Sequence, residues 1–413
     1  MGVDTYFTRP CSLRRLYEGP IGIQIDLFAD RLLSEGHSQA SATLHLRVVA
    51  DFSRWLAREK VGLSDLNEGI VERYLRCRSR HGKRTTGYHA VFRRLFAILR
   101  DVGAIRPRPP EDLGPLDQIA LDFERYSTQE RGLASSTVTA RKLALRQFLR
   151  DQHIARLESL SNLTAAEIGR FIDRYVQTHN RNLAEAMCST LRSFLQYLRY
   201  RGEISVELSG SLPHARKCRF TSLPSYLEPR EIERVLATCN RRSPVGRRDY
   251  AILQVLSRIG LRANEVRLLT LDDIDWESGQ LTIRGKGGRD AVMPLPKDVG
   301  AAIVDYLRRG RPISDSRRLF LRDHAPHDGF VTSGAVSCVA KLALRRAGIE
   351  GFARKGAHLF RHSLATTMLR AGASLREIGQ ILRHQNQDTT RIYAKVDLCA
   401  LRGLAFPWPG GVR

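Results

Sequence analysis

The sequence is poor in acid and contains no apolar run of membrane length. Its 413 residues hold 43 Asp and Glu against 67 Lys and Arg, a formal net charge of +24. Neither a long apolar span nor a signal peptide is evident, which argues against a membrane as the partner of this charge. The seven cysteines form no Cys-x-x-Cys pair, which argues against a disulfide framework or a zinc module and favours a reducing cytosol.

The basic excess is the most informative feature of the composition. A hydrophobic content of 42% with 27% charged residues is ordinary for a globular protein, and 413 residues predict two or three domains. A pI near 10.4 is not ordinary. Lys and Arg that neutralise phosphates release condensed counterions, so an excess on this scale favours a nucleic-acid partner.

The N-terminal quarter predicts an arm followed by a helical unit. Residues 1–20 show no apolar period and are expected to form a poorly anchored arm. Over 21–106 apolar residues recur at helical spacing, with Gly36, Gly62 and Gly103 at predicted helix ends, which indicates four helices. Prolines within 107–110 stop any helix, so 107–115 is predicted to be a linker.

The same pattern returns over residues 116–205. Gly132-Leu-Ala-Ser-Ser-Thr137 has the spacing of Gly36-His-Ser-Gln-Ala-Ser41, and Leu160-Ser-Asn-Leu163 that of Leu63-Ser-Asp-Leu66. Other matched pairs are Phe148 with Phe52, Phe171 with Tyr74 and Gly202 with Gly103. Helical periodicity alone would not share the glycine and Leu-Ser-x-Leu positions, so we predict tandem helical bundles from a duplication.

Both predicted bundles carry basic residues beside their second and fourth helices. Single charges on helix faces are usually just solvated, but one sign recurs here in both copies, which favours phosphate contacts. The DNA-binding candidates are Arg47, Arg54, Arg93, Arg141, Lys142, Arg146 and Arg192.

Residues 206–227 are basic and rich in Pro and Ser, and predict a second linker before a domain over 228–400. Helices are expected at 229–240, 247–258, 263–270, 297–309, 334–347, 358–371, 375–383 and 388–394. Alternating segments at 274–276, 281–284 and 291–294 predict a small antiparallel sheet, and a short strand is expected at 319–321. Residues 401–413 are predicted to form a C-terminal tail.

Two His, an Arg and a Tyr lie close together near the C-terminus. They are His358 and Arg361 in His358-Leu-Phe-Arg361-His362, then His384, then Tyr393. Each alone is more often a packing or surface residue, but together they suggest an anion-handling site. The i, i+4 spacing of His358 and His362 invites zinc, yet Leu359 stands where the Glu of His-Glu-x-x-His belongs and no third ligand is evident.

Two further basic residues that could belong to the same site, Arg262 and Lys286, precede His358 in the sequence. Arg262 stands in Gly260-Leu-Arg262-Ala-Asn-Glu265, where an Arg followed by Glu is usually a surface ion pair. Lys286 stands in Gly285-Lys286-Gly287-Gly288. A Lys in such a turn is usually a solvated tip, and no Ser or Thr follows it as in a phosphate-binding loop, so an ATP site is not supported.

The order of these residues resembles the tyrosine recombinase (phage integrase, Xer-like) family. The resemblance covers about 228–400 as a catalytic domain and 115–204 as a core-binding domain. It implies a mainly α fold with a small antiparallel β-sheet in the C-terminal domain, in which two tandem helical bundles precede a tyrosine-recombinase-type catalytic domain. The implied catalytic residues are Arg262, Lys286, His358, Arg361, His384 and Tyr393.

The resemblance also implies the chemistry. Arg262 and Arg361 would hold the non-bridging phosphate oxygens, with a further hydrogen bond from His384. Tyr393 would attack phosphorus to give a 3′-phosphotyrosyl link, with His358 as the base and Lys286 as the acid for the departing 5′-oxygen. Glu265 would orient the Arg262 helix. No cofactor, metal or nucleotide is needed.

The function expected is a site-specific DNA recombinase or integrase, encoded by a bacterial mobile element or plasmid. Its partner would be double-stranded DNA with inverted-repeat core sites, bound by a homo- or hetero-tetramer with possible accessory recombinases, in the bacterial cytoplasm at the nucleoid. The alternatives are a type IB topoisomerase-like enzyme and a non-catalytic DNA-binding protein. Typical bacterial members of the family have one helical bundle before the catalytic domain, whereas this sequence predicts two. The additional bundle, over 21–106, would be an arm-type or extra core DNA-binding domain, or a module for a protein partner.

Overall fold

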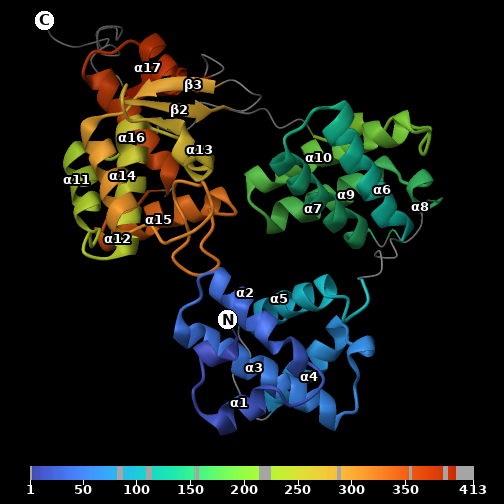
Figure 1. The fold of residues 1–413 in the computed structure, drawn as a ribbon. Coiled ribbons are helices and arrows are strands. Elements are labelled where there is room, and N and C mark those ends of the chain that lie inside the picture. Colours follow the sequence, from blue (N-terminus) through green and yellow to red (C-terminus); the bar gives the residue numbers. More distant parts are fainter. Residues whose placement is uncertain are drawn as a thin grey trace, which may run out of the picture. The chain divides into compact units, whose positions relative to one another are not determined.

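The computed structural model describes residues 2–80, 87–107, 114–152, 154, 158–213, 225–285, 290–352, 356–384 and 389–396. The chain forms two compact units, residues 107–219 and residues 1–106 with 220–413. It is mainly helical with one small antiparallel sheet, as predicted (Figure 1). No helix in the described ranges has the length and apolar character that a membrane span requires.

Residues 2–106 contain a bundle of helices with its own apolar core, here called the first bundle. Its core is rich in aromatic rings: Phe52 lies 4.9 Å from both Tyr74 and Phe92, measured between ring centroids. Ser38 begins the central helix by accepting a hydrogen bond from the amide of Ser41. The helices are α1(Pro10–Leu16), α2(Ile25–Ser34), α3(Gln39–Arg58), α4(Glu68–Arg80) and α5(Tyr88–Asp101).

The prediction of a loose arm over residues 1–20 was wrong. Pro10 begins α1, and Val3, Phe7 and Leu16 are buried in the core of the first bundle. Asp26 fixes the segment further, because its carboxylate accepts hydrogen bonds from the amide of Val3 and the hydroxyl of Tyr17. The apolar residues that bury this segment are spaced too irregularly for one helical period, so periodicity did not reveal them.

The second bundle, the described residues of 114–213, has a separate core. Its helices are α6(Pro115–Arg125), α7(Ser135–Asp151), α8(Glu158–Ser161), α9(Ala165–Thr178) and α10(Arg181–Tyr200), with a π-helical turn at Tyr126–Glu130. Part of the predicted linker over 206–227 belongs to folded structure: Leu208 and Leu212 are buried in this core, and Leu227 is buried in the next.

The tandem bundles predicted from the sequence repeat are confirmed in detail. The matched glycines adopt the same left-handed backbone, with φ of +77° at Gly36 and +58° at Gly132. The matched rings Phe148 and Phe171 lie 5.0 Å apart, close to the 4.9 Å between Phe52 and Tyr74. The two Leu-Ser-x-Leu turns close with equivalent hydrogen bonds, of 3.1 Å from Leu66 to Leu63 and 3.2 Å from Leu163 to Leu160.

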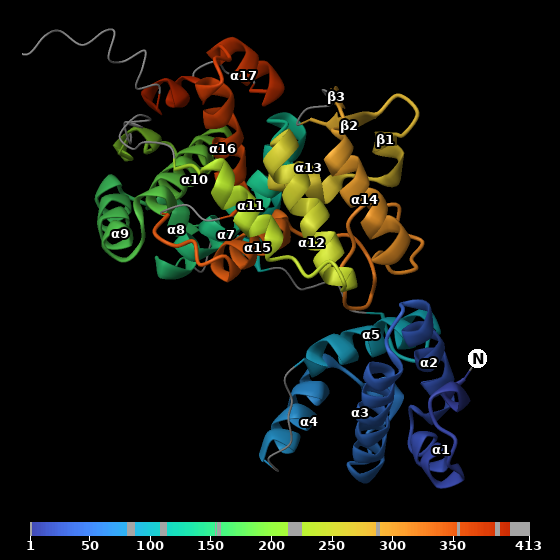
Figure 2. The same cartoon turned by 90° about the vertical axis from the view of Figure 1, so that its left-hand side faces the viewer.

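The C-terminal domain, the described residues of 225–396, places a three-stranded sheet at one end of a helical core (Figures 1 and 2). The antiparallel order is β1-β2-β3, with Leu281 opposite Ile274 on one side and Met293 on the other. The strands are β1(Ile274–Asp275), β2(Gln280–Arg284) and β3(Asp290–Pro294). The helices are α11(Pro229–Ala237), α12(Pro244–Gln254), α13(Ala263–Leu268), α14(Lys297–Arg309), α15(Ser333–Arg346), α16(Ala357–Arg370) and α17(Leu375–Ile381).

Three details of this domain differ from the sequence-based expectation. Ser243 caps α12 with Pro244 in its first turn, so this helix begins earlier than predicted. Leu321 forms a single bridge to Gly329 in place of a strand at 319–321. The last predicted helix is a 3₁₀ helix, η9(Arg391–Val396). Lys286 and the tail at 401–413 lie outside the described residues.

Candidate active site

Arg361 lies at the centre of the candidate site, on the buried side of α16. Its side chain is only 4% exposed, and its guanidinium donates to two backbone carbonyls, Gly260 O at 2.5 Å and Leu382 O. Arg361 therefore links α16 to the segment before α13 and to the residue that follows α17. Burial, with the nearby charge of Arg262, lowers the pKa of Arg361 to about 10, which still leaves it cationic at neutral pH. Because a guanidinium has five N–H donors, some remain for a ligand.

The segment before α13 brings Arg262 to the same place. A π-helical turn, η6(Val255–Ile259), ends α12, and Gly260 then adopts a φ of +71°. A Cβ at Gly260 would lie 2.8 Å from the Leu364 side chain, so glycine is required there by backbone and by space. Arg262 caps α13, and both its amide and its guanidinium donate to the Glu265 carboxylate at 2.8 Å.

Glu265 lies between two arginines. Its second partner is Arg383, whose guanidinium donates to it at 2.7 Å. Burial works against the carboxylate, but Arg383 and Arg262 outweigh that effect and hold the pKa of Glu265 below its ordinary value. The anion therefore stays ionised and holds both arginines in position.

Arg383 also ends α17 and aims His384. Its φ of +53° is left-handed, and the amides of Arg383 and His384 donate to the carbonyls of Gln380 and Gly379, the pattern of a Schellman helix end. Thr390 holds the imidazole, with its hydroxyl 2.7 Å from Nδ1 of His384. Burial, then the charges of Arg361 and Arg262, lowers the pKa of His384 to about 4, so the ring is neutral at pH 7. A neutral ring that accepts at Nδ1 carries its proton on Nε2, as a donor for an anion.

Tyr393 completes the cluster. It is 1% exposed and packs with Ala365, Ile378 and Leu382. Its hydroxyl lies 2.9 Å from Nδ1 of His362, and the two rings meet edge to face. Burial raises the pKa of Tyr393 to about 12, although the charges of Arg361 and Arg262 favour the phenolate. The phenol thus needs a proton acceptor, and one lies within hydrogen-bond distance.

Comparison with known proteins agrees with this arrangement. The phage integrase family matches residues 225–398, and the N-terminal SAM-like domain of phage integrases matches residues 121–202. The y4rA protein of Sinorhizobium fredii, an integrase/recombinase by name, is 42% identical over 401 residues and covers 97% of both chains. The chain belongs to the tyrosine recombinase family.

The Xer recombinases match a smaller part of this tyrosine recombinase. The tyrosine recombinase XerD of Listeria monocytogenes is 29% identical over 295 residues, which are 70% of this chain and 97% of XerD. Structures of XerH bound to its difH substrate and of a lambda integrase tetramer on a Holliday junction share the fold. Their TM-scores are 0.56 and 0.51, at 20% and 16% identity, and they cover 72% and 74% of this chain and 98% and 86% of their own.

The structure brings together four of the six catalytic residues predicted from the sequence: Arg262, Arg361, His384 and Tyr393. His358 lies one turn before Arg361 on α16. Three contributing residues were missed: His362, Arg383 and Thr390. His362 stands in the quoted His358-Leu-Phe-Arg361-His362 stretch, but only the fold shows that it contacts a tyrosine 31 residues away.

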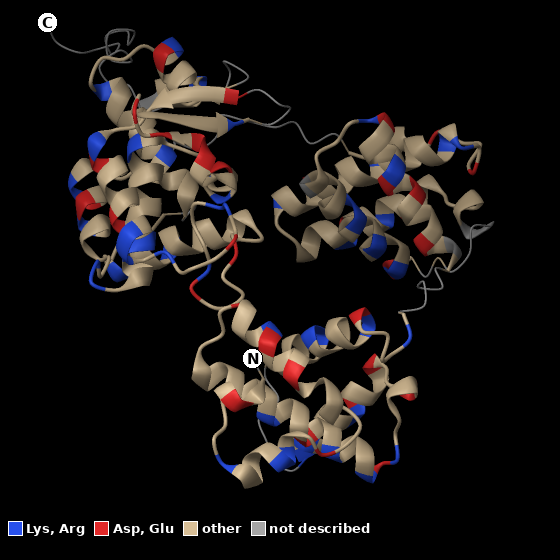
Figure 3. Ribbon diagram, viewed as in Figure 1, with Lys and Arg blue, Asp and Glu red and all other residues tan. Residues whose placement is uncertain are grey.

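Most of the predicted DNA-binding residues contact other residues of the same chain. Lys142 and Arg146 pair with Glu124 at 2.6 Å and Asp117 at 3.3 Å. Arg141 donates to Ser193, Arg192 to Leu212 O, and Arg54 to Arg15 O, while Arg47 lies over the Phe7 ring. Arg93 is exposed. Lys and Arg lie along helices in every part of the chain (Figure 3), so DNA contact by these seven stays a prediction.

Two substitutions of Arg383 should separate the effect of its left-handed backbone on stability from the effect of its ion pair on catalysis. Arg383→Ala and Arg383→Gly both remove the ion pair with Glu265, and we expect both to slow catalysis by about 10- to 100-fold, as a small misplacement of positioned groups does. Only glycine relieves the left-handed backbone, so Arg383→Gly should be more stable than Arg383→Ala by about 1 kcal/mol. Thermal unfolding and single-turnover cleavage measure both effects. Arg376→Ala, an exposed change on α17, is the control.

Proposed function

We propose that this tyrosine recombinase is an integrase-type enzyme that breaks and rejoins duplex DNA through a 3′-phosphotyrosyl bond at Tyr393. The observation that carries the proposal is the Tyr393 hydroxyl, 2.9 Å from an imidazole nitrogen and within the field of two arginines. No other described group combines a nucleophile, a proton acceptor and cations in this way. A phosphodiester repels nucleophiles through its anionic oxygens, and these cations offset that repulsion.

The reaction follows from the positions of these groups. Arg262 and Arg361 bind the non-bridging oxygens, and Nε2 of His384 donates to the same phosphate. The tyrosine oxygen forms a bond to phosphorus as its proton passes to an imidazole, and the 5′-oxygen leaves and takes a proton. We propose Lys286 as the donor of that proton and His358 or His362 as the acceptor. Rejoining reverses each step, so the bond energy is retained.

The proposal extends to the DNA substrate and to the oligomer that acts on it. Two inverted-repeat core sites, held by a tetramer, would supply the four strand ends that exchange requires; the lambda integrase neighbour is a tetramer on a Holliday junction. The name of y4rA includes integrase, which favours integration as the outcome. We propose that a mobile element or plasmid encodes the enzyme. Because y4rA aligns over 97% of both chains, the first bundle is shared with it, and we propose that this bundle binds DNA beside the core site.

A nicked suicide duplex tests the proposal. The duplex, taken from DNA flanking the gene, loses its short 5′-hydroxyl fragment after cleavage and traps the covalent complex. Wild type should give a protein–DNA band on a denaturing gel without metal or ATP, whereas Tyr393→Phe should give none. Tyr200→Phe, at a 73% exposed position, is the matched control. A band with Tyr393→Phe would identify another nucleophile, and specific retardation without any band would indicate a binding protein.

A further inference from the structure

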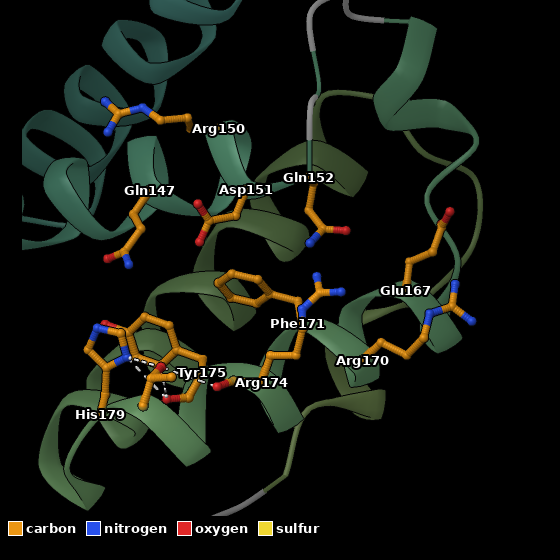
Figure 4. Close-up of a pocket in the computed structure, with 11 residues that line it drawn as sticks. Gln147, Arg150, Asp151, Gln152, Glu167, Arg170, Phe171, Arg174, Tyr175 and His179 are labelled. Atoms are coloured by element: carbon orange, nitrogen blue, oxygen red, sulfur yellow. Dashed lines mark hydrogen bonds between the residues drawn. The ribbon is translucent and has the colours of Figure 1, made fainter.

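The second bundle contains a basic recess that is far in sequence from the catalytic residues. It lies between the C-terminal end of α7 and the exposed face of α9, with a volume of about 750 Å³ (Figure 4). Arg150 comes from α7, and Arg170 and Arg174 come from α9. Residues 170 and 174 are one helical turn apart, so their side chains lie on the same face.

These three arginines lack the ion pairs that other basic residues of this bundle make. In the described part of the chain, no hydrogen bond or salt bridge engages the guanidinium groups of Arg150, Arg170 or Arg174. By contrast, Arg181 pairs with Glu185 at 3.1 Å and Arg199 with Glu207. Figure 4 shows Arg174 pointing into the recess, with Arg150 and Arg170 on either side of it. Glu167 interacts electrostatically with Arg170, but the three arginines still outnumber the acids of the recess, and an anion there would offset the excess positive charge.

The acids of the recess do not neutralise it. The Glu167 carboxylate accepts from the amide and hydroxyl of Thr164, at 2.9 and 2.8 Å, and so caps α9. Asp151 is the other acid. Burial, together with the negative charge of Asp151, raises the pKa of the Tyr175 hydroxyl. Three arginines therefore face two carboxylates, one of which already serves the helix end.

Packed aromatic rings and a neutral donor also line the recess. Tyr175 is buried, and the His179 ring stacks on it with centroids 3.9 Å apart and planes within 3°. The Arg174 guanidinium points into the middle of the recess, toward the side chains of Asp151 and Gln152 (Figure 4). Among the described residues, the buried Gln152 Nε2 has no acceptor. Forked cations beside amide donors are the chemistry that binds a phosphate.

We propose that this recess binds a backbone phosphate of duplex DNA, held by Arg170 and Arg174. The inference rests on the proposed function, since it assumes a DNA substrate. Arg150 follows Arg146 by one turn on α7, so the recess continues the basic face that was predicted to contact DNA. Free phosphate or a nucleotide offers the same chemical group, and the experiment separates these sources.

The salt dependence of binding to a labelled core-site duplex tests the proposal. Arg170→Gln/Arg174→Gln should reduce the slope of log K against log salt by about 0.9, the value for one lost phosphate contact. Arg181→Gln/Arg199→Gln removes the same charge from paired, exposed positions and should leave the slope closer to wild type. A slope for the recess variant equal to that of this control would overturn the proposal.

Two further arms complete the test. At saturating DNA the recess variant should still give the Tyr393-dependent covalent band, so a wild-type protein without that band would contradict the proposed function rather than the recess. Arg170→Lys/Arg174→Lys should keep most of the slope, because the cations remain. If inorganic phosphate raises the melting temperature of wild type but not of the glutamine variant, and the DNA slopes are equal, the recess binds free phosphate and the DNA assignment is wrong.

Discussion

Arg361→Lys is expected to slow strand cleavage by about 10²- to 10³-fold, the usual effect of losing one donor to a developing charge. Lysine keeps the charge but loses the planar fork, which in Arg361 donates to Gly260 O at 2.5 Å and to Leu382 O. Single-turnover cleavage of the suicide duplex at saturating protein measures the effect.

The same substitution should also lower the melting temperature. A lysine ammonium cannot reach both carbonyls, so at least one buried acceptor loses its partner, at a cost of about 1–3 kcal/mol. Arg370→Lys is the matched control on α16, because Arg370 is exposed and pairs with Glu228 at 2.8 Å. If Arg361→Lys cleaved as fast as Arg370→Lys, Arg361 would hold the fold together but would not bind the scissile phosphate.

Patterns that repeat along the chain were readable from the sequence. The glycines at 36, 132, 103 and 202 all adopt positive φ, which explains why they could be matched between the bundles. The sheet was predictable because Leu281 and Ile283 alternate with polar residues on β2. The order and the sequence neighbours of Arg262, Arg361, His384 and Tyr393 selected them through the family resemblance, and their residue types fit because few side chains can bind a phosphate or attack it.

Contacts across the fold were not readable. Nothing in the order of residues indicates that Arg383 takes a left-handed backbone and pairs with Glu265, 118 positions earlier. Likewise, charge patterning could not separate Lys142 and Arg146, which form salt bridges, from Arg170 and Arg174, which form none among the described residues. Net charge measures how much basic surface exists, whereas pairing decides which part of it can meet a phosphate.

The sequence and the structure point to different residues as the proton acceptor for Tyr393. The resemblance implies His358, while the hydroxyl of Tyr393 lies within hydrogen-bond distance of Nδ1 of His362. Both lie on α16, one on each side of Arg361. Because burial raises the pKa of Tyr393 to about 12, the phenol is protonated at neutral pH and its rate of attack depends on that acceptor.

We expect His362→Asn to lower the cleavage rate by about 10²-fold or more, the range for loss of a general base. Asparagine can still accept a hydrogen bond near the Nδ1 position, so the melting temperature should change little, but it cannot take up a proton. The wild-type rate should fall as the acceptor is protonated at acidic pH, and this acidic limb should disappear in His362→Asn while it persists in His358→Asn. If the limb disappears in His358→Asn instead, His358 is the base, and His362 only holds the tyrosine before DNA binds.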